Sequence, residues 1–129
     1  MLIETLSVFP EMFEPVMSTS ILGRARKAGL FDFKAYNLRD WTHDVHHSVD
    51  DTPVGGGAGM VMLAQPIVDA IRDVQGGRRV KRIYLSPRGE TLTQKKAEQL
   101  AKEDELILLC GHYEGVDQRF IDAYVDAQV

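Results

Sequence analysis

The segment CGHYEGVDQRF, from Cys110 to Phe120, carries the most chemistry in the chain and directly follows the apolar run ELILLC. A short apolar run of this kind is typical of a buried strand. This one ends in groups that can hydrogen-bond, stack and titrate, whereas core strands usually end in simple turn residues. Tyr113 can cover an aromatic ligand, Glu114 can accept a hydrogen bond or a proton, and the flanking glycines let a ligand approach the backbone. The segment is therefore a candidate wall of a binding site.

A second strand also ends unusually, in IYLSPRGE at residues 83–90. Ser86 and Pro87 stop the strand, and Gly89 relaxes the backbone after it. In open parallel sheets, ligands bind beyond the carboxyl ends of the strands. If the two strands are neighbours, both exit loops face one pocket. Either loop alone is explained equally well as an ordinary connection that needs glycine, but the two together favour a site.

The loop HHSVDDTPVGGGAGMVM, residues 46–62, is the third candidate. Its glycines, Gly57 and Gly59 among them, expose amides that can contact a phosphate or a base edge. A Walker loop would end in Gly-Lys-Ser/Thr, and a dinucleotide fingerprint would place its glycines directly after a strand, so neither motif is present. Asp50 and Asp51 can bind a metal or a base edge, although paired aspartates also occur in plain turns.

The remaining reactive side chains favour structural roles. Three histidines, at 43, 46 and 47, stand in a polar loop without a cysteine partner and are more typical of solvated side chains than of metal ligands. Cys110 ends an apolar strand and is expected to be a core residue, not a nucleophile. Two basic clusters can contact phosphates or form solvated faces. They contain Arg24, Arg26, Lys27, Arg78, Arg79, Lys81 and Arg82.

Composition indicates one globular domain over residues 1–129, with 44% apolar and 26% charged residues. The net charge of -4 does not suggest a nucleic-acid partner by itself. A single cysteine rules out an intrachain disulfide and a cysteine zinc cluster. No apolar run is long enough to span a membrane, and the N-terminus does not look like a signal peptide, so we expect a cytoplasmic protein.

The apolar pattern alternates between strand and helix. Strands are predicted at 2–9, 30–38, 79–86 and 105–110, and helices at 12–17, 20–29, 66–75, 91–102 and 116–125. Gly29 is expected to cap the second helix, and Thr91 with Gln94 to form a capping box. Residues 39–63 show no clear period and are expected to form a long functional loop. This order predicts a three-layer α/β domain with a mostly parallel sheet.

Five segments in order resemble the bacterial tRNA (guanine-N1)-methyltransferase family: FPEMF, SILGRARKAGL, VDDTPVGGGAGMVM, YLSPRGETLTQ and LLCGHYEGVDQR. The resemblance implies the SPOUT methyltransferase fold with a deep trefoil knot, S-adenosylmethionine as cofactor, a homodimer with active sites at the subunit interface, and tRNA as substrate. The reaction it implies is methylation of guanosine N1 on the 3′ side of the anticodon. A non-catalytic RNA-binding or dimerisation module of the same fold is the alternative.

The resemblance also assigns residues. It implies cofactor contacts at Tyr84, Leu85, Ser86, Pro87, Gly111, Tyr113, Glu114 and Gly115. It places Asp50, Gly57 and Gly59 toward the target guanine and the partner subunit, and gives Arg24 a role in holding the tRNA. Glu114 is the candidate catalytic carboxylate, for proton handling or for Mg²⁺, and no other metal site is expected.

Two departures from the family pattern bear on activity. Val54 stands where the family usually has an aromatic residue before the glycines. The chain stops at IDAYVDAQV, before the third cofactor loop, the catalytic aspartate and the tRNA-binding domain that the family pattern leads one to expect. We therefore expect these 129 residues alone to transfer little or no methyl.

Overall fold

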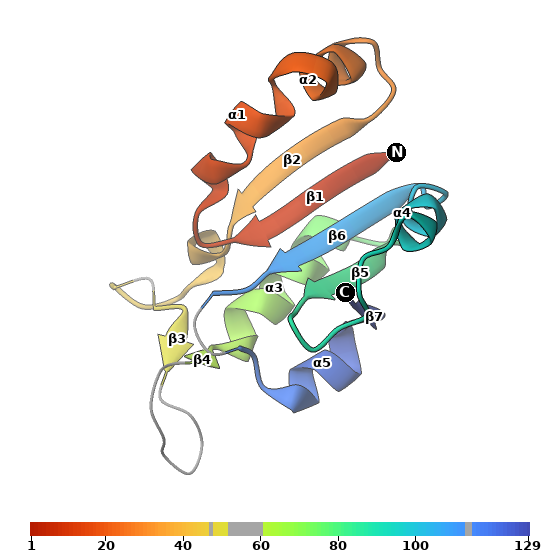
Figure 1. The fold of residues 1–129 in the computed structure, drawn as a ribbon. Coiled ribbons are helices and arrows are strands. Elements are labelled where there is room, and N and C mark those ends of the chain that lie inside the picture. The colour runs from red at the N-terminus through yellow and green to blue at the C-terminus, as the bar shows by residue number, and fades with distance from the viewer. Residues whose placement is uncertain (47, 52–60, 113–114) are drawn as a thin grey trace.

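A five-stranded parallel sheet, with strand order β2-β1-β6-β5-β7, forms the centre of the molecule (Figure 1). It is seen in a computed structural model that describes residues 1–46, 48–51, 61–112 and 115–129. The strands are β1 (Leu2–Ser7), β2 (Asp32–Asn37), β5 (Lys81–Leu85), β6 (Glu105–Cys110) and β7 (Ala127–Gln128). Every neighbouring pair in this sheet is parallel, which confirms the predicted α/β class with a mostly parallel sheet.

Helices flank both faces of the sheet. The longest, α3 (Ala64–Gln75), and α5 (Gln118–Tyr124) share one buried core with the sheet, whereas η1 (Pro10–Met12), α1 (Glu14–Met17) and α2 (Ser20–Lys27) follow β1 and lie near β2 (Figure 1). The remaining helices are η2 (Leu38–Trp41) and α4 (Gln94–Leu100). Gly29 has a φ of 77° just beyond α2, which confirms the predicted glycine cap.

The main core lies between the sheet and α3. Leu6 and Leu109 stand opposite each other in the register of β1 and β6, so their side chains share one face and pack into a buried cluster with Ile67 of α3. Phe33 of β2 points to the other face, where its ring centroid lies 6.3 Å from that of Phe13. Both faces of the sheet are thus used, as a three-layer arrangement requires.

The start of α4 differs from its prediction. The helix begins at Gln94, and the hydroxyl of Thr93 accepts a hydrogen bond from the Lys96 N–H at 3.1 Å. The predicted capping box of Thr91 and Gln94 is therefore wrong, because Thr93 has the extended backbone that points its side chain at the free amides of the first turn.

The segment predicted as a loop over 39–63 contains regular structure. It begins within η2, and β3 (Asp50–Asp51) pairs antiparallel with β4 (Val61–Met62). Two-residue strands are too short to leave a periodic pattern, which also explains why β7 was not predicted. Across the ranges that the structure describes, no helix has both the length and the apolar character to cross a membrane.

Candidate functional site

The two unusual strand exits lie side by side. Leu85, the last residue of β5, stands opposite Cys110, the last residue of β6, in a parallel pair. The segments that begin at Ser86 and Gly111 therefore leave the sheet from adjacent points on its carboxyl edge (Figure 1). This confirms the predicted convergence, at the edge where parallel sheets bind ligands.

Tyr84 lies beneath the exit of β6. Its side chain is buried, and a Cβ on Gly111 would stand 3.1 Å from its Cε2 atom and 3.3 Å from its hydroxyl oxygen. The ring occupies this place because residue 111 has no side chain. Burial raises the pKa of Tyr84, so its hydroxyl stays protonated at neutral pH and can donate a hydrogen bond.

Gly115 connects the exit of β6 to the short ribbon of β3 and β4. It has a φ of 131°, which favours glycine, and its carbonyl accepts a hydrogen bond from the Met62 N–H at 2.8 Å. Met62 is the register partner of Asp50 across the ribbon. The fold therefore brings the β3 strand of Asp50, predicted to face the substrate, to the same edge as the two exits.

The turn after β5 is fastened to the C-terminal segment. The Ser86 N–H donates to the Val129 carbonyl at 2.9 Å, and the Glu90 N–H donates to the Gln128 carbonyl at 3.0 Å. A Cβ on Gly89 would come within 2.5 Å of the Gln128 carbonyl carbon and the Val129 nitrogen. The close approach requires glycine, and it gives the turn a fixed position.

A small cavity of about 90 Å³ opens between the turn and α5. It is lined by Tyr84, Ser86, Pro87, Arg88, Gly115, Val116, Gln118, Ile121 and Gln128. Binding sites for small molecules typically enclose about 300–1,000 Å³, so this cavity alone is smaller than such a site. Four of the predicted cofactor residues line it. The sequence did not identify the other five, although Arg88 stands within the segment SPRGE. They are Arg88, Val116, Gln118, Ile121 and Gln128.

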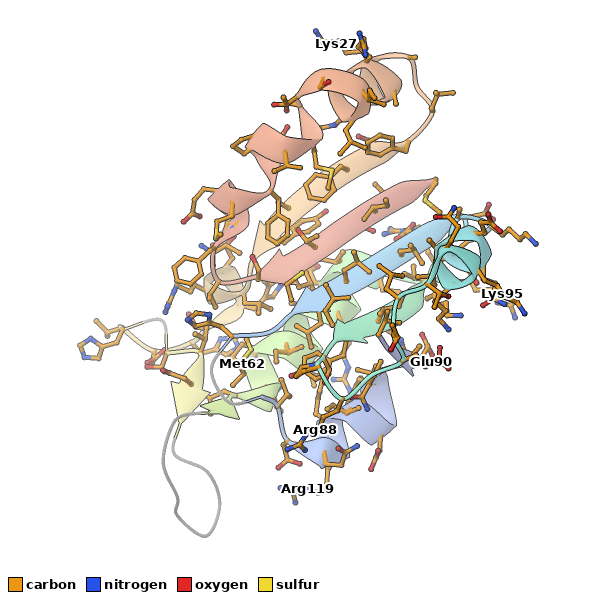
Figure 2. The ribbon with its side chains drawn as sticks, viewed as in Figure 1. Lys27, Met62, Arg88, Glu90, Lys95 and Arg119 are labelled. Atoms are coloured by element: carbon orange, nitrogen blue, oxygen red, sulfur yellow. The ribbon has the colours of Figure 1, made fainter. Side chains whose placement is uncertain are left out.

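Some predicted residues lie elsewhere. Leu85 is adjacent to Tyr84 and points to the opposite face of the sheet, with a half-exposed side chain, so any cofactor contact is left to its backbone. Arg24 lies on α2, whose last residue, Lys27, is at the far end of the molecule from Met62 and Arg88 (Figure 2). Its tRNA role remains a prediction. Four predicted site residues, Gly57, Gly59, Tyr113 and Glu114, and the departure at Val54 lie outside the described residues.

The reactive side chains outside the cavity have ordinary surroundings. His43 is largely exposed, and its Nε2 lies 3.2 Å from the Asp69 carboxylate. Burial raises the pKa of the Cys110 thiol to about 11, which leaves almost no thiolate at neutral pH. Within the described parts of the chain, no three histidine, cysteine or acidic side chains gather as a metal site would require.

Comparison with known proteins places these features in a family. Residues 1–129 match the family model described as tRNA (Guanine-1)-methyltransferase TrmD. Proteins named tRNA (guanine-N(1)-)-methyltransferase are similar: those of Clostridium perfringens and Ruminiclostridium cellulolyticum are 52% and 48% identical, over 100% and 98% of this chain. The matches cover 54% and 55% of those two proteins, so the chain spans about half the length of the curated relatives it matches.

Proposed function

Because the chain belongs to the tRNA (guanine-1)-methyltransferase family, which has the SPOUT fold, we propose that it carries the cofactor site of an enzyme that methylates guanosine N1 beside the anticodon of tRNA. S-adenosylmethionine is the proposed methyl donor. The observation that carries the proposal is the adjacency of the two strand exits, since residues proposed to contact the cofactor come from both.

The described residues fit such a cofactor. Gly111 is exposed and has no side chain that would keep a ligand from its backbone, and Tyr84 presents a buried ring with a protonated hydroxyl. A large ligand with polar groups is bound well by an apolar surface with a few fixed polar atoms. The turn at residues 86–90, which is hydrogen-bonded to the C-terminal segment, supplies such atoms in a fixed position. Ligand binding therefore costs little conformational entropy in this turn.

The chemistry requires alignment and proton removal. Guanine N1 carries a proton and is a poor nucleophile near neutral pH, so transfer needs a base at N1 and hydrogen-bond donors at O6. S-adenosylmethionine, when bound, supplies a methyl group activated by its sulfonium. The role of this chain is to hold the donor in line with the base. Glu114 is the proposed proton-handling carboxylate.

Mg²⁺ enters no step of this proposal. The cation prefers several oxygen ligands in near-octahedral geometry, and the described residues offer no such set. A Mg²⁺ role for Glu114 remains a prediction, tested by whether EDTA abolishes methyl transfer.

The proposed partners are tRNA and a second copy of the chain. Three side chains on η1, α1 and α2, those of Met12, Val16 and Ile21, are 69%, 56% and 71% exposed, and apolar surface of this kind favours association. Sedimentation velocity measures the mass directly. A monomer at micromolar concentration would contradict the homodimer. The knot and the cytoplasmic location also remain predictions.

Methyl transfer tests the function. The protein expressed from its complete reading frame is incubated with unmodified tRNA transcripts and S-adenosylmethionine labelled in the methyl group. We expect label at N1 of the guanosine on the 3′ side of the anticodon, and none in a transcript with adenosine there. Residues 1–129 alone are expected to transfer little or none. Absence of both label and cofactor binding heat would favour the non-catalytic module.

A further inference from the structure

Arg88 is an unpaired cation at the mouth of the cavity. It is exposed, lines the cavity and, within the described residues, makes no side-chain hydrogen bond or ion pair. Nearby arginines differ. Arg82 pairs with Asp126 at 3.2 Å, and Arg119 pairs with Asp117 at 2.9 Å. The charge of Arg119 on α5 is therefore neutralised locally, as is that of Arg82 near the start of β5, whereas that of Arg88 is available.

The surroundings of Arg88 suit an anion. Among the described residues that line the cavity there is no aspartate or glutamate. The nearest acid in the same turn, Glu90, is engaged by the Lys96 ammonium at 2.8 Å. The positive charge of Arg88 also lowers the pKa of Tyr84 against the larger effect of burial, so the guanidinium acts on the interior of the cavity.

The backbone beneath Arg88 is fixed. Its N–H donates to the Ser86 hydroxyl oxygen at 3.1 Å, and the next N–H, that of Gly89, donates to the Ser86 carbonyl at 3.0 Å. Figure 2 shows Arg88 beside α5, on the same side of the molecule as Arg119. A guanidinium on a fixed backbone loses less freedom when it binds a ligand than one on a mobile loop.

We propose that Arg88 binds an anionic oxygen of the molecule that enters the cavity, and so fixes its orientation. The inference rests on the proposed function, which supplies two sources of such an oxygen: the carboxylate of S-adenosylmethionine and a phosphate of tRNA. Guanidinium groups bind both through paired hydrogen bonds.

Two variants and a matched control test the role of Arg88. Arg88→Gln removes the charge, and Arg88→Lys keeps it without the paired geometry. The control is Arg79→Gln, which removes the same charge from an exposed arginine just before the amino end of β5, beside Val80 and Glu103. Both arginines are exposed, so all three variants are expected to keep the unfolding temperature of the wild type.

Calorimetry with S-adenosylmethionine, and tRNA binding over a series of salt concentrations, separate the two sources. If the oxygen belongs to the carboxylate, Arg88→Gln weakens cofactor binding about tenfold or more and leaves the decarboxylated cofactor unaffected. If it belongs to a phosphate, the variant weakens tRNA binding and lowers the slope of log K against log salt by about 1. Arg88→Lys is expected to recover part of either loss.

The outcomes separate this inference from the proposed function. Wild type that binds both ligands, with Arg88→Gln unchanged in every arm, overturns the inference alone. An equal loss in Arg79→Gln also overturns it, because general electrostatics would then explain the effect. Wild type that binds neither cofactor nor tRNA refutes the proposed function and the inference with it.

Discussion

A buried carboxylate in β1 is expected to make the stability of the fold depend on pH. Glu4 is 1% exposed and shares a single guanidinium with Glu105. Arg78 donates from Nε and Nη2 to the two oxygens of Glu105, both at 2.9 Å. The Oε1 atom of Glu4 lies 3.7 Å from Nη2 and has no hydrogen-bond partner among the described residues. The guanidinium thus donates two hydrogen bonds to Glu105, and the negative charge that Glu4 would carry when ionised is poorly compensated.

This arrangement raises the pKa of Glu4 from 4.5 to about 7, because of burial first and then the hydrogen bond and negative charge of Glu105. Arg78 and Tyr36 act in the opposite direction. The folded chain therefore keeps a proton that the unfolded chain releases between about pH 4.5 and pH 7, and the free energy of unfolding falls as pH rises through this window. At about 1.4 kcal/mol per pKa unit, the loss by pH 8 is at most about 3 kcal/mol.

Glu4→Gln tests this directly, since the amide keeps the shape and cannot ionise. Urea unfolding at pH 5, 6, 7 and 8 should show the variant about 1–3 kcal/mol more stable than wild type at pH 8 and similar to it at pH 5. Glu103→Gln is the control, because Glu103 is an exposed partner of Lys81 at 3.9 Å and should not change the profile. If Glu4→Gln and wild type lose stability in parallel from pH 5 to pH 8, the reasoning is refuted.

Three further predictions follow from close approaches and burial near the site. Gly89→Ala should lower the free energy of unfolding by roughly 1–3 kcal/mol, because its Cβ would meet the C-terminal backbone. In the control Gly77→Ala, the added Cβ has no atom within 4 Å, so the free energy of unfolding should change by no more than about 0.5 kcal/mol. Equal urea midpoints for the two variants would contradict this. Cys110 should react slowly with Ellman's reagent in the folded chain at pH 8 and quickly in urea, since burial raises its pKa to about 11; equal rates would refute the burial effect. Gly111→Ala should displace the Tyr84 ring and weaken S-adenosylmethionine binding in calorimetry, while an unchanged Kd would place the cofactor elsewhere.

The parts of the site that could be predicted from the sequence are those formed by residues that are consecutive in the chain. The runs that became β5 and β6 are long enough to show apolar content, and their exits carry residues that a plain turn does not need. Their convergence was a prediction that required the two strands to be neighbours, and the opposition of Leu85 and Cys110 confirms it. A local pattern sufficed because each exit belongs to one short segment.

Pairings between distant residues could not be predicted in this way. Arg78 and Arg82 belonged to a basic run that was open to either phosphate contact or solvation, yet Arg78 is held by Glu105 and Arg82 by Asp126. These partners are 27 and 44 residues away along the chain. No periodicity links such positions, because ion pairs depend on which strands become neighbours. The sequence therefore identified charges near the sheet without showing which of them remain free.

The same pairings explain why the site depends on a segment that contributes few atoms to it. The Arg82 N–H donates to an Asp126 carboxylate oxygen at 2.7 Å, and the Asp126 N–H donates back to the Arg82 carbonyl at 2.8 Å. This exchange fixes β7 beside β5, and β7 in turn holds the turn that carries Arg88. The contact between Arg82 and Asp126 at the start of β5 thus helps to position the cavity wall at the end of the same strand. Because backbone hydrogen bonds to the C-terminal segment hold the turn, the side chain of Arg88 can remain free for a ligand, as a preorganised site requires.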